Sequence, residues 1–156
     1  MTTHLVEPIR KEIVVEAPIE RAFRVFTDNL DSWWPRGHHI GKAPLQRAVL
    51  EPELGGRWYE IGDDGSECNW GKVLAWDPPR RLLLAWQIDA QWQYDAKLIT
   101  ELEVTFTAQG AQRTLVELEH RNLERFGEAA AALREMMDRG WSGIVGIYAE
   151  TAGQAQ

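Results

Sequence analysis

The sequence is nearly without cysteine and has no concentration of positive charge. Cys68 is its one cysteine, so no disulfide can form within the chain, which is typical of proteins in a reducing compartment. Lys42 and Lys72 have no basic neighbour, the arginines alternate with acidic residues, and the net charge is −7. Because phosphates and acidic lipids would be repelled, we expect neither a nucleic-acid partner nor an anionic membrane partner.

Long hydrophobic segments are absent as well. The apolar run from Leu82 to Trp86 is far too short to cross a bilayer, which takes about 20 residues. The first residues, MTTHLVEPIRKEIVV, have neither the apolar run nor the cleavage site of a secretory signal. We therefore expect a cytoplasmic protein without membrane insertion.

The motifs of common catalytic and metal sites are missing too. His38 and His39 are adjacent, whereas two metal ligands on one helical face stand four residues apart, and Cys68 has no paired cysteine. No serine lies in a nucleophile-elbow motif, and the GGRW segment lacks the ending of a phosphate-binding loop. The sequence therefore predicts no metal site, no cofactor and no nucleophilic catalysis.

Tryptophan, in contrast, is abundant. Each indole ring can bury roughly 150–250 Å² and still carries an N–H group that needs a partner. So many rings with a polar edge indicate either an unusually aromatic core or the lining of a pocket. The eight tryptophans are Trp33, Trp34, Trp58, Trp70, Trp76, Trp86, Trp92 and Trp141.

The length of 156 residues predicts one domain, residues 1–156, with its core within about residues 10–150. Residues 10–16 are rich in β-branched side chains and predict a first strand. A short amphipathic helix should run from Pro18 to Phe26, and residues 28–37 should add one or two helical turns. Six further strands are predicted at residues 45–51, 57–61, 68–76, 81–88, 99–107 and 113–120, before a long helix at 128–149.

This order of elements, with the patterns PIERAFRVFTD, GGRWYEIGDDG, GKVLAWDPPRRLLLAW, TELEVTFT and GWSGI, resembles the SRPBCC superfamily, which includes START domains and the birch pollen allergen. Within it, the chain is similar to the bacterial proteins related to the C-terminal domain of the heat-shock-chaperone ATPase activator. The resemblance implies an α+β helix-grip fold, in which a strongly bent seven-stranded antiparallel sheet surrounds a long C-terminal helix and two short helices follow the first strand. Members include ligand carriers, aromatic polyketide cyclases, self-sacrifice resistance proteins and co-chaperone domains, so the fold alone does not select an activity.

A bent sheet around a helix leaves a cavity unless large side chains fill it. A dry apolar void of about 300 Å³ would cost about 7 kcal/mol, which is comparable to the whole stability of a domain. The space must therefore hold side chains, water on polar groups, or a ligand. The tryptophans could either fill the space with their own side chains or line a pocket that holds a ligand.

Alternation along the strands places Trp86 and His120 on the inner face of the sheet, and Trp141 lies on the apolar face of the last helix. His120 could bond a ligand carbonyl there, although a core histidine bonded to a neighbour is the more common outcome. Glu60 lies two residues after Trp58 in the same predicted strand, so both side chains should point to the same face of the sheet. Glu60 could lie inside as an acid–base group, but we prefer an outward orientation in contact with Lys72 or Arg57.

Four aromatic residues are expected near an entrance. Trp33 and Trp34 end the second helical segment at the mouth of the cavity, where one ring could stack on a ligand while the other packs the helices against the sheet. Trp92 and Tyr94 fall in a predicted loop, and exposed rings there are hard to explain without a lid or a partner.

We therefore predict a protein, monomeric or homodimeric, that binds an apolar or aromatic small molecule between the sheet and the C-terminal helix. Two alternatives stay open: a cyclase- or dehydratase-like enzyme with Glu60 or His120 as its acid–base group, and a module that stimulates a chaperone ATPase, as the resemblance implies. The expected ligand-binding residues are Trp34, Trp58, Trp70, Trp86, Trp92, Tyr94, His120, Met137 and Trp141.

Overall fold

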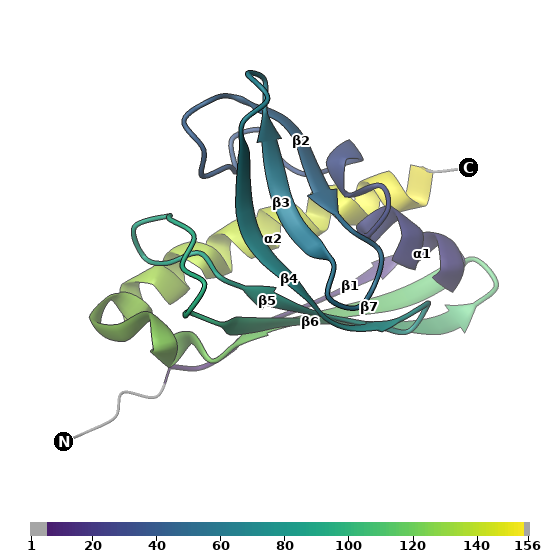
Figure 1. The fold of residues 1–156 in the computed structure, drawn as a ribbon. Coiled ribbons are helices and arrows are strands. Elements are labelled where there is room, and N and C mark those ends of the chain that lie inside the picture. The colour runs from purple at the N-terminus through teal and green to yellow at the C-terminus, as the bar shows by residue number, and fades with distance from the viewer. Residues whose placement is uncertain (1–5, 155–156) are drawn as a thin grey trace.

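A seven-stranded antiparallel sheet curls around one long helix, as the computed structural model in Figure 1 shows. The structure describes residues 6–154, and residues 1–5 and 155–156 of the predicted domain lie outside the described part. The strands are β1 (Ile9–Val15), β2 (Leu45–Leu50), β3 (Arg57–Gly62), β4 (Glu67–Asp77), β5 (Arg81–Trp86), β6 (Thr100–Gly110) and β7 (Arg113–Arg121). The helices are α1 (Ile19–Phe26), the 3-10 turns η1 (Leu30–Ser32) and η2 (Leu123–Ala129), and α2 (Ala130–Gln154). This is the expected helix-grip fold.

The strand order is β1-β7-β6-β5-β4-β3-β2, so the first strand of the chain pairs with the last. All the other pairs join neighbours in sequence, which the short connections between them require. β1 and β7 pair from Ile9 with His120 to Val15 with Thr114. The helix α2 packs against β1, next to the strand that precedes it in the chain.

The first short helix buries one face, with Ala22, Phe23 and Phe26 turned inward as the periodicity predicts. The second helical segment is shorter than predicted, since only the single turn η1 forms. Pro35 disfavours a helical backbone at the residue before it, which explains the early end. The indole of Trp33 also donates a hydrogen bond of 2.7 Å to the Val25 carbonyl and thereby turns back into the core.

The long helix α2 begins two residues later than predicted and extends further, to Gln154. Within η2, Gly127 has φ 78° and breaks the helical backbone shortly before α2 begins. The buried side chains of α2 recur every three or four residues, as expected for one apolar stripe: Leu133, Met137, Trp141, Ile144 and Tyr148. The Tyr148 hydroxyl donates a 2.6 Å hydrogen bond to the Ala22 carbonyl and thereby joins α2 to α1.

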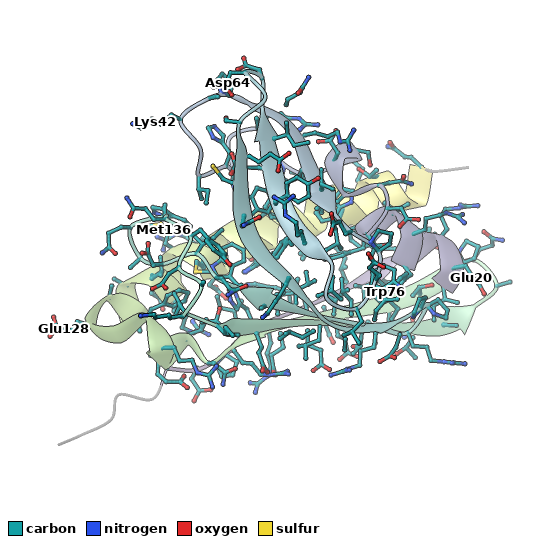
Figure 2. All side chains as sticks on the ribbon, in the orientation of Figure 1. Glu20, Lys42, Asp64, Trp76, Glu128 and Met136 are labelled. Atoms are coloured by element: carbon teal, nitrogen blue, oxygen red, sulfur yellow. The ribbon has the colours of Figure 1, made fainter. Side chains whose placement is uncertain are left out.

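Aromatic side chains fill one half of the space between the sheet and α2. Phe26 contacts Trp33, Phe106 and Tyr148 with ring centroids 5.1–6.0 Å apart. Trp76 covers the outer side of this cluster near α1, where Figure 2 labels it. The half next to α1 is therefore core, and a ligand-sized space can remain only in the other half.

The outer face of the sheet is charged. Arg121 on β7 lies within 3.2 Å of carboxylate oxygens of Glu101, Glu103 and Glu119, and Arg81 also contacts Glu103. Such half-exposed pairs contribute little stability each, about 0–1 kcal/mol. Among the helices of residues 6–154, none has the length and hydropathy needed to cross a membrane.

Candidate functional site

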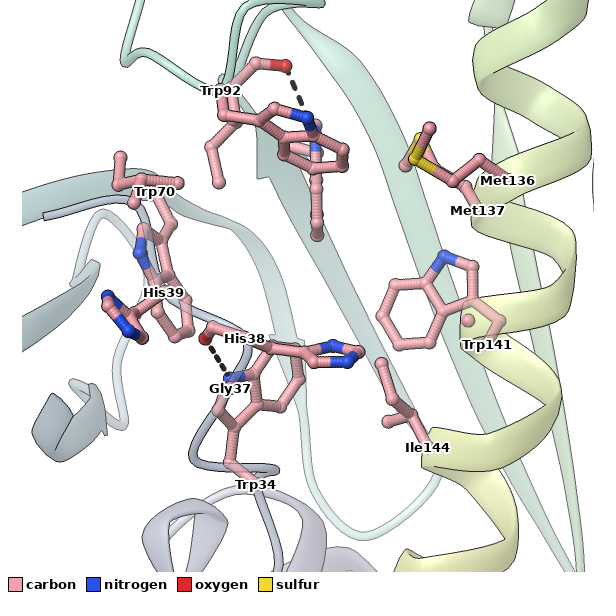
Figure 3. A pocket seen from close by; sticks show the side chains of 14 residues that line it. Trp34, Gly37, His38, His39, Trp70, Trp92, Met136, Met137, Trp141 and Ile144 are labelled. Carbon is pink, nitrogen blue, oxygen red and sulfur yellow. Dashed lines mark hydrogen bonds between the residues drawn. The ribbon is translucent and has the colours of Figure 1, made fainter. Parts of the chain in front are cut away.

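A pocket of about 430 Å³ opens between the sheet and α2, in the half that the aromatic core leaves free. Figure 3 shows the helix on one side and loop residues with the sheet on the other. The lining comes from the segment after η1, from the inner face of β4 and β5 with the loop that follows, and from α2. These residues are Trp34, Gly37, His38, His39, Ile40, Trp70, Trp86, Ile88, Trp92, Met136, Met137, Gly140, Trp141 and Ile144.

Five of the eight tryptophans line this pocket. The Trp34 and Trp70 rings lie 5.2 Å apart at an interplanar angle of 38° and form one wall. Trp141 of α2 and Trp86 of β5 meet edge to face at 6.1 Å on the other side. The inward orientation predicted for Trp86 and Trp141 is confirmed.

Hydrogen bonds fix the orientation of four of these rings. The indole N–H groups of Trp34 and Trp86 donate to the carbonyls of His38 and Ile88, at 2.8 and 3.2 Å. Those of Trp70 and Trp141 donate to Glu60 and His120 respectively. Because the polar edges are occupied, the apolar parts of these rings are left to face the pocket.

Trp58 and Tyr94, both expected to bind ligand, do not line the pocket. Trp58 lies behind the wall, with its ring 5.6 Å from Trp70 and 5.7 Å from Trp86. Its indole nitrogen is buried and has no hydrogen-bond partner among residues 6–154. Tyr94 pairs with Ile88 in an isolated bridge and is 40% exposed.

His120 is on the inner face, as predicted, but it is fully buried behind the wall and does not line the pocket. An indole N–H can only donate, so Trp141 donates to Nδ1 of His120 at 3.3 Å and the ring proton is on Nε2. Nε2–H then donates to the Thr100 hydroxyl at 2.8 Å, and that hydroxyl donates to the Trp86 carbonyl at 3.3 Å. Burial lowers the pKa of His120 to about 3, so the ring is neutral near pH 7.

Glu60 also points inward, and the outward orientation that we preferred is wrong. Its side chain is 1% exposed. One carboxylate oxygen accepts hydrogen bonds from the Ile40 amide at 2.6 Å and from the Trp70 indole at 2.7 Å, and the other accepts one from the Gly41 amide at 3.1 Å. The expected partner Arg57 bonds Asn69 and Glu67 instead. The donors to Glu60 come mainly from a loop 20 residues earlier, which strand parity does not reveal.

His38 and His39, which we considered only as metal ligands, both line the pocket. The His38 imidazole extends toward Ile144 across the pocket in Figure 3 and lies 6.3 Å from the Trp34 ring. Nδ1 of His39 lies 2.9 Å from the Gly41 carbonyl. These two are the only titratable side chains in the described lining.

Trp92 and Met136 form the rim of the pocket. They are 41% and 51% exposed and come from the loop after β5 and from α2. The carboxylate of Asp89 accepts hydrogen bonds from the amides of Gln91 and Gln93, which holds Trp92 in a tight turn at φ 60°. The ring that seemed hard to bury from the sequence is thus only half-buried, at the entrance.

The remaining pocket residues differ in how far the sequence could have revealed them. Ile144 lies on the apolar stripe of α2, and Ile88, two residues beyond the end of β5, continues the alternation of Trp86. Met136, Gly140, Gly37 and Ile40 carry no such signal. In the described part of the chain, no group of three or more His, Cys, Asp or Glu side chains is close enough to hold a metal ion.

Residues 16–148 match the family described as Activator of Hsp90 ATPase homolog 1-like protein. Among solved structures, the chain is similar to Txn09, an anthrahydroquino-gamma-pyrone synthase complexed with SUM. The identity is 40%, the match covers 86% of this chain and 88% of that chain, and the TM-score is 0.62. The chain is also similar to CalC, a self-sacrificing resistance protein from Micromonospora echinospora. The identity is 31%, the match covers 93% of this chain and 93% of that chain, and the TM-score is 0.70.

The Aha1 dimer from Colwellia psychrerythraea is 15% identical, covers 96% of this chain and 100% of that chain, and has a TM-score of 0.67, which shows a shared fold. No curated protein sequence is a significant match.

Proposed function

We propose that this chain, which belongs to the family of Activator of Hsp90 ATPase homolog 1-like proteins, binds a planar aromatic small molecule in the tryptophan-lined pocket. The observation that carries this proposal is the set of five pocket indoles, four of them held in place by hydrogen bonds of their N–H groups. Rings fixed in this way can stack on a flat ligand without first losing conformational freedom.

The volume and the lining support a ligand of drug-like size. Small-molecule pockets usually measure about 300–1,000 Å³, and about 430 Å³ lies within that range. An open apolar pocket of this kind holds water, and release of that water from the indole surfaces favours an apolar ring. The flexible thioethers of Met136 and Met137 on α2 can adapt to the edge of the ligand.

The polar groups of the lining indicate how such a ligand would be oriented. His38 and His39 come from one loop, whereas the α2 side of the pocket is formed by methionine, glycine, tryptophan and isoleucine. A fused ring with hydroxyl or carbonyl groups along one edge could direct that edge toward the imidazoles. An anthrahydroquino-gamma-pyrone, the product class in the name of the 40% identical synthase, is a fused-ring compound of this type.

The test is a titration of the full chain with 1,8-dihydroxyanthraquinone, followed by calorimetry and by quenching of tryptophan fluorescence. We expect saturable binding at one site per chain. Trp92→Ala should weaken it, whereas Tyr94→Ala should not, although the two residues share a loop and are 41% and 40% exposed. Equal losses in the two variants, or no saturable binding by the wild type, would contradict the proposal.

A second candidate function is catalysis of a ring closure on the bound compound. It is favoured by the 40% identity to a synthase and by the position of His38, whose imidazole is exposed within the pocket. Ring closure requires a proton to leave one atom and reach another, and an imidazole within reach of the ligand can carry it. His38→Gln should then abolish turnover of an uncyclised aromatic polyketide and leave its binding within about threefold, as expected when the lost interaction acts only in the transition state.

The chaperone role implied by the family description stays a prediction. A purified Hsp90-type chaperone provides its test, with the ATPase rate measured with and without this chain. Stimulation of that rate by a protein that binds no anthraquinone would favour the interaction module over the ligand-binding protein.

A further inference from the structure

The loop that carries the pocket histidines has little regular structure of its own. Residues 35–44 lie between η1 and β2 and form neither a helix nor a strand. Four consecutive residues of this loop, 37–40, line the pocket. Within the loop, the described backbone hydrogen bond is the one from the His38 amide to the Pro35 carbonyl, at 3.1 Å. Something outside the loop must therefore hold its position.

Glu60 of β3 attaches the loop at Ile40 and Gly41, and the Trp34 indole attaches it at the His38 carbonyl. The two carboxylate oxygens of Glu60 accept hydrogen bonds from successive loop amides, those of Ile40 and Gly41, at 2.6 and 3.1 Å. The loop backbone also packs closely against the Glu60 carboxylate at Gly41. A Cβ atom at Gly41 would lie 2.9 Å from the carboxylate and 3.1 Å from the sulfur of Cys68.

The same carboxylate also orients a ring of the pocket wall, because the Trp70 indole donates to it at 2.7 Å. No lysine or arginine in the described part of the chain forms an ion pair with Glu60, and Nδ1 of His39 is 4.0 Å away. A buried carboxylate needs such donors to offset its loss of water, and hydrogen bonds to a charged acceptor are stronger than neutral ones. The three N–H groups and the carboxylate therefore stabilise one another.

We propose that Glu60 is a positioning residue of the ligand site, which fixes the 37–41 loop and the Trp70 ring as one rigid wall. This inference rests on the proposed binding function, and it assigns Glu60 no contact with the ligand, since Glu60 does not line the pocket. Its loss frees the loop and lets Trp70 rotate. Ligand affinity then falls because the wall must be ordered again on binding.

The main test uses Glu60→Gln, which keeps the size of the side chain but places an NH₂ group against N–H donors. Amide hydrogen exchange at Ile40 and Gly41 is measured on the free protein, together with the NMR resonance of the Trp70 indole N–H. Affinity for 1,8-dihydroxyanthraquinone is measured in parallel. Glu103→Gln is the control, because it removes the same charge from the outer face of β6, where Glu103 bonds Arg81 and Arg121.

We expect exchange at Ile40 and Gly41 to accelerate at least tenfold in Glu60→Gln, the Trp70 indole resonance to shift, and affinity to fall about tenfold. Glu103→Gln should change none of these. Unchanged exchange at the two loop amides would overturn the proposal whatever the ligand does. Accelerated exchange with unchanged affinity would overturn the positioning role.

A second variant keeps the proposal testable if Glu60→Gln does not fold. Gly41→Ala retains the carboxylate but presses a methyl group against it, so exchange at the loop amides should again accelerate while the strands stay protected. If the wild-type protein binds no anthraquinone, the proposed function fails, and loop exchange together with the Trp70 resonance still decides whether Glu60 fixes the wall.

Discussion

Trp141 of α2 donates a hydrogen bond of 3.3 Å to Nδ1 of His120 on β7, and this bond ties one wall of the pocket to the sheet. The imidazole continues the connection through Thr100 to the carbonyl of Trp86. Two pocket tryptophans from opposite elements are thus held by one buried, neutral histidine. A charged imidazole could not accept the bond from Trp141, so this part of the wall depends on the protonation state of His120.

Stability should therefore fall as the pH is lowered through the range where free histidine titrates. In the folded protein, burial holds the pKa of His120 near 3, whereas the unfolded chain binds the proton near pH 6.5. Between these values the unfolded state binds more protons, so acid favours unfolding, by up to about 1.4 kcal/mol per pH unit. Urea denaturation at pH 7.5, 6.0 and 5.0 measures this slope.

His120→Asn separates this effect from the other titrating groups. The variant should be less stable at pH 7.5, by about 1–3 kcal/mol, because buried hydrogen bonds and packing are lost. Its stability should depend less on pH between 6.5 and 5.0. Lowered pKa values of Asp31 and Glu103 affect stability only at more acidic pH. Parallel slopes for variant and wild type would show that His120 is not the group responsible.

Asn122 offers a test of backbone strain next to this network. It has φ 66°, in the left-handed region, and its buried side-chain oxygen has no hydrogen-bond partner among residues 6–154. Asn122→Gly should leave stability unchanged or raise it by up to about 1 kcal/mol, since glycine adopts this backbone freely. Asn122→Ala should lower stability by about 1 kcal/mol. Thermal unfolding should therefore have a higher midpoint for Asn122→Gly than for Asn122→Ala, and the reverse order would contradict the strain.

The helix-grip fold could be predicted because its strands and helices carry local signals. The apolar stripe of α2 and the alternation along β5 and β7 place Trp141, Trp86 and His120 correctly, since each signal depends only on residues within one element. Packing of one half of the cavity by aromatic rings could not be deduced, because it depends on which rings from distant elements meet.

The site was harder to predict because its walls depend on contacts between segments far apart in the chain. Glu60 lies inside since Ile40 and Gly41 donate to it, and nothing in the sequence shows that this loop folds over β3. A register shift between Trp58 and Tyr59 also interrupts the simple alternation of the central hairpin. The same loop brings His38 into the pocket, a position that adjacent histidines alone do not indicate.

Substitution of Gly140 tests whether the ligand occupies the space next to this residue of α2. Alanine at either Gly140 or Gly143 would place its Cβ in open space, with no atom within 4 Å apart from the neighbouring residues and the backbone of the helix itself. Each substitution should therefore raise helix stability by about 0.5–1 kcal/mol, measured by thermal unfolding.

Ligand binding should distinguish the two positions, because Gly140 lines the pocket and Gly143 does not. A methyl group at position 140 takes up space that a fused-ring ligand would fill, so Gly140→Ala should weaken binding of 1,8-dihydroxyanthraquinone by about 1–3 kcal/mol. Gly143→Ala should leave the dissociation constant unchanged. A stabilised Gly140→Ala variant with undiminished affinity would mean that the ligand does not reach this part of α2. The ligand would then have to lie closer to Trp34 and Trp70.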